Sequence, residues 1–189
     1  MAAGLDGLQE AVEFVEEGGS AEPAVRIMKI YLAGPLGFSE AGRFYQDAIL
    51  IPELSRTGHE ILNPWKLTDQ RKIDAILAMP YGSARRDAWR NLNVEIGGNN
   101  RVAIDRSNIV FAVLDGVDVD SGTASEVGYA FAKGKPILGY RGDLRLSADN
   151  EGSIVNLQVE YFIRQSGGDI VTNVADALAR IETLAKDPL

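Results

Sequence analysis

Glu126 is the residue of this sequence best suited to act as a nucleophile. It lies in Ser121-Gly-Thr-Ala-Ser-Glu-Val-Gly128, a segment that begins a predicted helix shortly after a buried apolar strand. The positive end of a helix favours an ionised carboxylate. Tyr31 belongs to another predicted strand, and its hydroxyl could orient that carboxylate through a hydrogen bond. A carboxylate held in this way can attack an anomeric carbon, as in retaining glycoside chemistry.

The same segment also admits purely structural interpretations. Thr123-x-x-Glu126 fits a capping box at the start of a helix, which would give Glu126 no chemical task. Asp115, Asp118 and Asp120 precede the helix and could be solvated loop residues or ligands for Mg²⁺. The segment by itself leaves both interpretations open.

Apolar runs and turn residues divide the chain into alternating strands and helices. Strands are expected at 26–33, 59–62, 108–114, 135–140 and 169–171, and helices at 5–16, 39–57, 99–107, 122–133, 153–165 and 173–185. Residues 66–98 are polar, with local helical patterns and breaks at Pro80-Tyr-Gly82 and Gly97-Gly98.

This order predicts the fold class. Strands that alternate with helices pair in parallel through right-handed crossovers, and short apolar strands suit a sheet buried on both faces. We expect an α/β fold, a doubly wound, Rossmann- or flavodoxin-like parallel five-stranded sheet with helices on both faces. Residues 1–25 would be an accessory helix and linker, and 26–189 a single domain. Ligands bind such sheets at the carboxyl ends of the strands, here after residues 33, 63, 114 and 140.

Composition excludes several classes of function. The 189 residues carry a net charge of −8, which disfavours nucleic-acid binding. No apolar stretch is long enough to span a membrane, and no secretory signal is apparent, so we expect a cytoplasmic protein. Cysteine is absent, which removes disulfides and thiolate metal sites. The one histidine, His59, has the setting of a turn residue, and a Ser-His-Asp triad would depend on it.

Cofactor motifs are also missing from the sequence. Gly34-Pro-Leu-Gly37 follows the first predicted strand but lacks the spacing of a dinucleotide-binding loop. Gly134-Lys135 precedes a strand, the reverse of a phosphate-binding P-loop, and Ser125 has no nucleophile elbow around it. We therefore expect neither a dinucleotide-binding loop nor a P-loop, and no cluster of histidine and cysteine indicates a transition-metal site.

Four segments together resemble the nucleoside 2-deoxyribosyltransferase family over roughly residues 27–186. They are Lys29-Ile-Tyr-Leu-Ala-Gly-Pro35, Asp120-Ser-Gly-Thr-Ala-Ser-Glu-Val-Gly-Tyr-Ala130, Gly134-Lys-Pro-Ile137 and Asn156-Leu-Gln158. The first two are specific in combination, because they lie far apart in the chain and in the right order.

The resemblance implies a role for each matching position. Glu126 would form a covalent deoxyribosyl ester, Tyr31 would hold its carboxylate, and Asp120 would contact the base or help to protonate it. Asn100 falls where many members have an aspartate that meets the base. The remaining implied substrate contacts are Gly34, Gly122, Phe38 over the base, and Asn156 and Gln158, which would reach the sugar 5′-hydroxyl in a neighbouring subunit's site.

The implied partners are a nucleoside and a free nucleobase, in a homo-oligomer with shared active sites and with no cofactor. Trp65, Trp89 and the segment 66–98 are expected to shape the base pocket. One alternative is a nucleoside 5′-monophosphate N-glycosidase, which would need a phosphate pocket, and another is a nucleotide-binding module without turnover. The candidate phosphate ligands are Arg85, Arg86, Arg90, Arg141 and Arg145.

Overall fold

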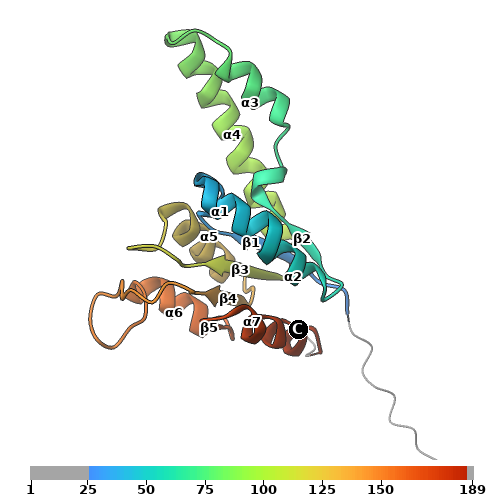
Figure 1. Cartoon of the computed structure of the whole chain (residues 1–189), viewed down its shortest axis with the longest axis vertical. Helices are drawn as coiled ribbons and strands as arrows, with labels where there is room; N and C mark the ends of the chain where they lie inside the picture. The colour runs from blue at the N-terminus through green and yellow to red at the C-terminus, as the bar shows by residue number, and fades with distance from the viewer. Residues whose placement is uncertain (1–25, 187–189) are drawn as a thin grey trace, which may run out of the picture.

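The computed structural model describes residues 26–186, which form one parallel sheet between layers of helices (Figure 1). The strands are β1 (Lys29–Ala33), β2 (Glu60–Leu62), β3 (Ile109–Val113), β4 (Ile137–Tyr140) and β5 (Asp169–Val171), in the spatial order β2-β1-β3-β4-β5. All neighbouring pairs are parallel. The doubly wound α/β fold expected from the sequence is confirmed. The helix expected at 5–16 lies outside the described residues.

The principal helices are α1 (Glu40–Tyr45), α2 (Ile51–Ser55), α3 (Gln70–Leu77), α4 (Ser83–Arg106), α5 (Ser121–Ala132), α6 (Leu157–Gln165) and α7 (Val174–Lys186). Short 3₁₀ turns, η1 (Leu36–Phe38) and η3 (Pro64–Lys66), follow β1 and β2. No helix within residues 26–186 is both long and apolar enough to cross a membrane.

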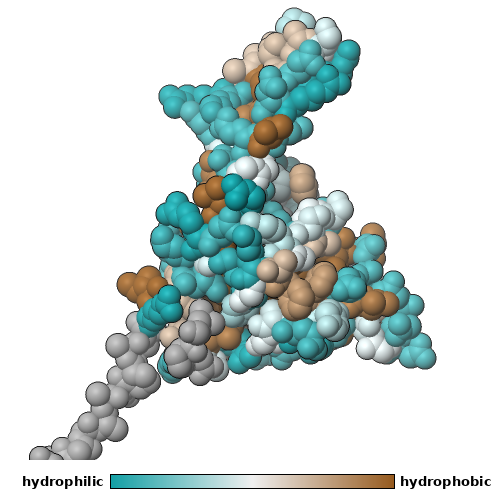
Figure 2. Space-filling model, turned by 180° about the vertical axis from the view of Figure 1, so that it is seen from behind, coloured by the Kyte–Doolittle hydropathy of each residue, from teal (hydrophilic) through white to brown (hydrophobic). Residues whose placement is uncertain are grey.

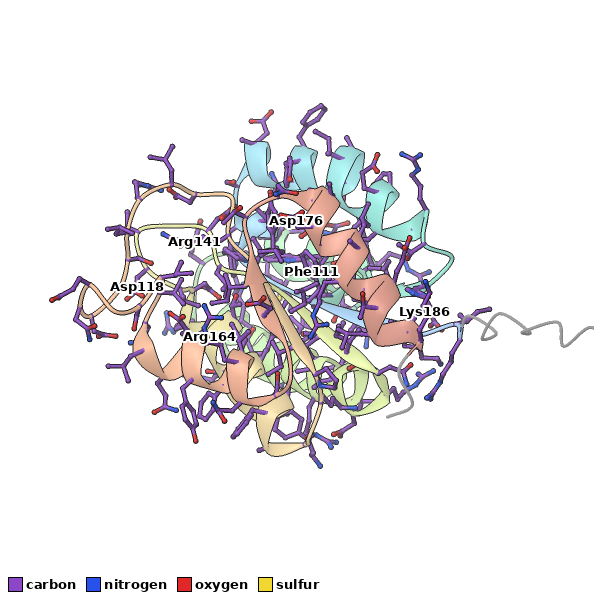
Figure 3. The ribbon with its side chains drawn as sticks, turned by 90° about the horizontal axis from the view of Figure 1, so that it is seen from below. Phe111, Asp118, Arg141, Arg164, Asp176 and Lys186 are labelled. Carbon is purple, nitrogen blue, oxygen red and sulfur yellow. The ribbon has the colours of Figure 1, made fainter. Side chains whose placement is uncertain are left out.

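Alternate residues of the central strands face opposite layers, as the pleat of a strand requires. Ile30, Leu32 and Phe111 pack with residues of α2 and α7, and Figure 3 places Phe111 between the helical layers. Tyr31 and Val110 face the other layer, with residues of α4, α5 and α6. This alternation puts the side chain of Tyr31, in the middle of an apolar strand, on the same side as α5.

The helix expected at 39–57 is present and runs without a gap through α1, η2 (Gln46–Leu50) and α2. Its middle segment, η2, is a π-helical turn. Pro52 follows that turn at the start of α2. Proline has no N–H to give to the carbonyl four residues earlier and its ring crowds that carbonyl, so a widened turn accommodates it.

Helices α3 and α4 form an arm that rises away from the layered body in Figure 1. Figure 2 shows this arm, at the top, covered largely by hydrophilic residues. The break expected at Gly97-Gly98 is wrong, because α4 continues through both glycines from Ser83 to Arg106. Packing of its C-terminal half against β1 and α5 outweighs the cost of about 1 kcal/mol that a glycine adds in a helix interior.

The loops after β3 and β4 are held together by Arg141, a residue that is only 3% exposed. Its guanidinium donates hydrogen bonds to the carbonyl oxygens of Leu114, Gly116 and Arg145. Figure 3 shows Arg141 among these loops, beside the sheet edge. The loop before α6 is longer than expected, since α6 begins at Leu157 rather than at 153.

Candidate active site

Tyr31 and Glu126 are joined by a short hydrogen bond, although 95 residues separate them in the sequence. The Tyr31 hydroxyl donates to Oε1 of Glu126 at 2.6 Å. Burial, reinforced by the charge of Glu126, raises the pKa of Tyr31 far above its ordinary value. The phenol therefore stays protonated and remains a donor to the carboxylate.

The start of α5 fixes where Glu126 lies. Asp120 is the N-cap, and its Oδ2 accepts hydrogen bonds from the backbone N–H of Thr123 at 2.9 Å and from its hydroxyl at 3.0 Å. Glu126 follows in the second turn of the helix. The capping-box interpretation of Thr123 and Glu126 is wrong, because Asp120 takes the capping role and leaves Glu126 to face β1 and α4.

Asn100 approaches the same carboxylate from α4. Its Nδ2 donates to Oε1 of Glu126 at 3.4 Å. Burial raises the pKa of Glu126 above its ordinary value, and the nearby charge of Asp120 adds to this increase. The hydrogen bonds from Tyr31 and Asn100 act in the opposite direction, because they stabilise the ionised form.

A pocket of about 290 Å³ opens beside Glu126 at the carboxyl edge of the sheet. It lies where the loop after β1, the turn after β2 and the helices α4 and α5 meet, and Tyr31 lies beneath it in the core. The lining residues are Gly34, Phe38, Pro64, Trp65, Ile96, Asn100, Asp120, Gly122, Thr123 and Glu126. The structure thus gathers six predicted site residues, Gly34, Phe38, Asn100, Asp120, Gly122 and Glu126, around one cavity.

One wall of this pocket is aromatic. The rings of Phe38 and Trp65 meet edge to face, with centroids 4.7 Å apart and an interplanar angle of 89°. Gly37 lies against the indole so closely that a Cβ at this position would be 2.1 Å from Trp65. Gly34 is similarly close to β3, where a Cβ would lie 2.8 Å from the Cβ of Val113. No larger residue fits at either glycine, because the neighbouring side chain packs directly against the backbone. The aromatic wall offers apolar surface on which a flat ring can stack.

A second pocket, of about 320 Å³, also reaches Glu126 and is lined by residues of α4 and α5. It shares Asn100, Gly122 and Glu126 with the first. Its other lining residues are Gly97, Arg101, Ile104, Ser125 and Tyr129. Glu126 therefore borders both pockets.

Two predicted substrate contacts lie outside both pockets. Asn156 is the N-cap of α6, where its Oδ1 accepts hydrogen bonds from the backbone N–H groups of Gln158 at 3.0 Å and Val159 at 3.3 Å. Gln158 is exposed on the first turn of that helix. Within this chain neither residue lines the space beside Glu126.

The arginines considered as phosphate ligands also lie elsewhere. Arg85, Arg86 and Arg90 belong to the arm, and Arg85 donates to the carbonyl of Met79 at 3.1 Å. Arg141 is buried against backbone carbonyls, and Arg145 pairs with Asp143. None of the five lines either pocket beside Glu126.

The sequence does not single out three residues that line the first pocket, Pro64, Ile96 and Thr123. Asn63-Pro64 at the end of a predicted strand was a signal for the first. Ile96 falls in the segment 66–98 that was expected to shape the base pocket, but no local pattern distinguished it from its neighbours. Trp65 lines the pocket as expected, whereas Trp89 does not. Across residues 26–186, no three His, Cys, Asp or Glu side chains are grouped as a metal site requires.

The fold and this cavity define an α/β protein with a pocket for a small molecule at the carboxyl edge of its sheet. The chain belongs to the nucleoside 2-deoxyribosyltransferase family, whose model matches residues 30–158. No protein with a curated description matches the sequence.

Solved structures show the same fold. A conserved protein from Enterococcus faecalis V583 is 25% identical, with a TM-score of 0.57, and the match covers 84% of this chain and 99% of that one. A 2-desoxiribosyltransferase from Leishmania mexicana is 24% identical, with a TM-score of 0.56 and coverages of 82% and 97%. A 2-deoxyribosyltransferase from Bacillus psychrosaccharolyticus is 24% identical, with a TM-score of 0.53 and coverages of 85% and 98%.

Proposed function

We propose that this protein transfers the 2-deoxyribosyl group of a 2′-deoxynucleoside to another purine or pyrimidine base through a covalent ester on Glu126. The observation that carries the proposal is the 2.6 Å hydrogen bond between Tyr31 and Glu126 beside the pocket. Membership of the nucleoside 2-deoxyribosyltransferase family supports the same chemistry.

In the first half of the reaction, a carboxylate oxygen of Glu126 attacks C1′ of the nucleoside. Tyr31 and Asn100 both donate to Oε1, so Oε2 is the oxygen that we assign to the attack. The bond between C1′ and the base nitrogen breaks, and its electron pair leaves with the base, which takes up a proton. Asp120 lines the pocket and is the candidate for contacting the base or assisting that proton.

In the second half, a nitrogen of another base attacks C1′ of the ester and releases Glu126. Two displacements at the same carbon restore the original anomer, and ping-pong kinetics follow. Water in place of the second base would give slow hydrolysis. Phe38 and Trp65 offer the departing and the incoming base the same stacking surface.

The alternative activity, N-glycosidic hydrolysis of a nucleoside 5′-monophosphate, requires cationic groups for the phosphate. Arg101 lines the second pocket, but it pairs with Asp105 at 3.0 Å. Asp120 and Glu126 add negative charge to the site, and a phosphate dianion beside them would be repelled. These contacts favour a substrate with an uncharged 5′-group.

The test is incubation of the protein with 2′-deoxyadenosine and a different free base, followed by chromatography of the products. We expect a new deoxynucleoside, and adenine released in equal amount. Replacing 2′-deoxyadenosine with its 5′-monophosphate, with and without the second base, separates transfer from nucleotide hydrolysis. Hydrolysis of the monophosphate without transfer of its sugar to the second base would favour the N-glycosidase alternative.

A binding module without turnover is excluded by a covalent adduct. Denaturing mass spectrometry after mixing with substrate should find one deoxyribosyl group on the peptide that contains Glu126. The Glu126→Ala variant should stay folded, form no adduct and lose transfer by at least about 10³-fold. Normal turnover by this variant would refute the proposed mechanism.

A further inference from the structure

The two polar atoms of the Asn100 side chain differ in their hydrogen bonding. Its Nδ2 donates to Glu126, whereas its Oδ1 is buried and has no hydrogen-bond partner within residues 26–186. A carboxylate only accepts hydrogen bonds, so the nitrogen is the end that must face an ionised Glu126. The orientation of this amide is therefore fixed by the carboxylate.

A buried acceptor without a partner is unfavourable, and native proteins retain few of them. The adjacent residue shows the ordinary arrangement: Asn99 donates to the carbonyl of Leu67 at 3.3 Å and to the hydroxyl of Thr68 at 3.4 Å. Asn99 thus ties α4 to the turn after β2. Among the residues that the structure describes, the side chain of Asn100 makes no such structural contact, and its one hydrogen bond goes to the proposed nucleophile.

The end of α4 is anchored so that Asn100 is held against α5. Lys135, just before β4, donates its Nζ to the carbonyls of Asp105 at 3.1 Å and Ser107 at 2.6 Å. The hydroxyl of Tyr129, on α5, donates to Oδ1 of Asp105 at 2.8 Å. These bonds fasten the last turn of α4 to its neighbours, about one turn beyond Asn100.

We propose that Asn100 is a positioning residue for the nucleophile: together with Tyr31 it holds Oε1 of Glu126, keeps the carboxylate ionised and leaves Oε2 facing the sugar. The inference rests on the proposed function and deepens it, because it assigns Asn100 to the nucleophile instead of to the base. An aspartate at this position could not do the same when ionised, since it would replace a donor with a second negative charge.

The charged and titratable groups around Glu126 come from three elements. Tyr31 of β1 donates to it, and Asp120 at the start of α5 repels it. Arg101 of α4 and Tyr129 of α5 line the second pocket with it, and both are hydrogen-bonded to Asp105. Asp120 is the acid whose charge opposes ionisation of Glu126, so a second acid at position 100 should have a large effect.

The experiment compares Asn100→Asp with Asn99→Asp, which makes the same change one residue away. In Asn100→Asp the acid limb of the pH profile of kcat/KM should move upward by about one pH unit or more. The KM of the acceptor base should stay within about twofold of the wild-type value, because in this proposal Asn100 contacts the nucleophile and does not bind the base. Asn99→Asp should keep the wild-type acid limb.

A readout that does not need turnover separates this inference from the proposed function. The carboxyl carbon of Glu126, assigned by NMR with the Glu126→Gln variant, should titrate at higher pH in Asn100→Asp than in the wild type. Asn100→Ala, which adds no charge, should shift in the same direction by less. An unmoved titration of Glu126 in both variants, or an altered acceptor KM with an unmoved acid limb, would overturn the role of Asn100. Loss of transfer in the wild type itself would instead refute the proposed function.

Discussion

Glu126 illustrates the conflict between stability and chemistry at a single residue. Its carboxylate is largely buried, which disfavours the ionised form that the proposed attack requires. Tyr31 and Asn100 offset part of that cost with hydrogen bonds to Oε1. The folded state therefore holds a charge that the unfolded chain would expose to water, and the protein is less stable than it would be with a neutral group there.

Glu126→Gln should accordingly stabilise the fold while it abolishes transfer. The folded-state pKa of Glu126 is raised, so this group favours folding below its ordinary pKa near 4.5, and that contribution is lost as the pH rises through the folded-state value. The gain in unfolding free energy should then be about 0.5–2 kcal/mol at pH 8 and smaller near pH 4. Urea denaturation of both proteins at the two pH values measures this difference. Equal gains at both pH values would show that the charge of Glu126 is not the cause.

At the scale of elements, the strands could be predicted because their apolar runs need burial on both faces. The order of strands and helices in the sequence then set the parallel sheet and its carboxyl edge. The arm was harder to delimit, because the polar sequence of α4 gives little amphipathic periodicity, whereas the shorter α3 is clearly amphipathic. Tertiary packing, and not local propensity, decides that α4 continues through Gly97-Gly98. Pocket residues such as Pro64 and Ile96 could not be assigned for a different reason. They meet only because α4 and η3 fold against each other.

Two glycines in these elements should respond in opposite ways to alanine. A Cβ on Gly98 meets no atom within 4 Å, so Gly98→Ala should add about 1 kcal/mol to stability through helix propensity and leave activity unchanged.

A Cβ on Gly37 would lie 2.1 Å from Trp65, so Gly37→Ala must displace the indole and deform the aromatic wall. In Gly37→Ala we expect a raised KM for the donor nucleoside and for the acceptor base, measured by initial rates. Thermal denaturation of the variant is the control for folding. An unchanged KM in Gly37→Ala would mean that Trp65 does not contact the base.

At the scale of the whole molecule, Asn156 and Gln158 are implied contacts of the sugar, but they do not line the pockets beside Glu126 in their own chain. Both lie at the start of α6, and Asn156 already caps that helix through its Oδ1. We propose that this end of α6 meets the pocket of a neighbouring copy, where the two amides reach the sugar 5′-hydroxyl. Each active site would then combine Glu126 of one chain with Asn156 of another.

Subunit mixing tests this arrangement directly. Asn156→Ser removes the amide but keeps an oxygen that can cap α6, so the helix should persist. Glu126→Ala and Asn156→Ser proteins should each be weakly active alone. After joint unfolding and refolding, random pairing should restore about a quarter of the wild-type activity, because one site in four would receive both intact residues. Native mass spectrometry, which separates the two variants by their masses, would establish that mixed oligomers form. Mixed oligomers without recovered activity would show that each site is built within one chain, and the cap would then be the whole role of Asn156.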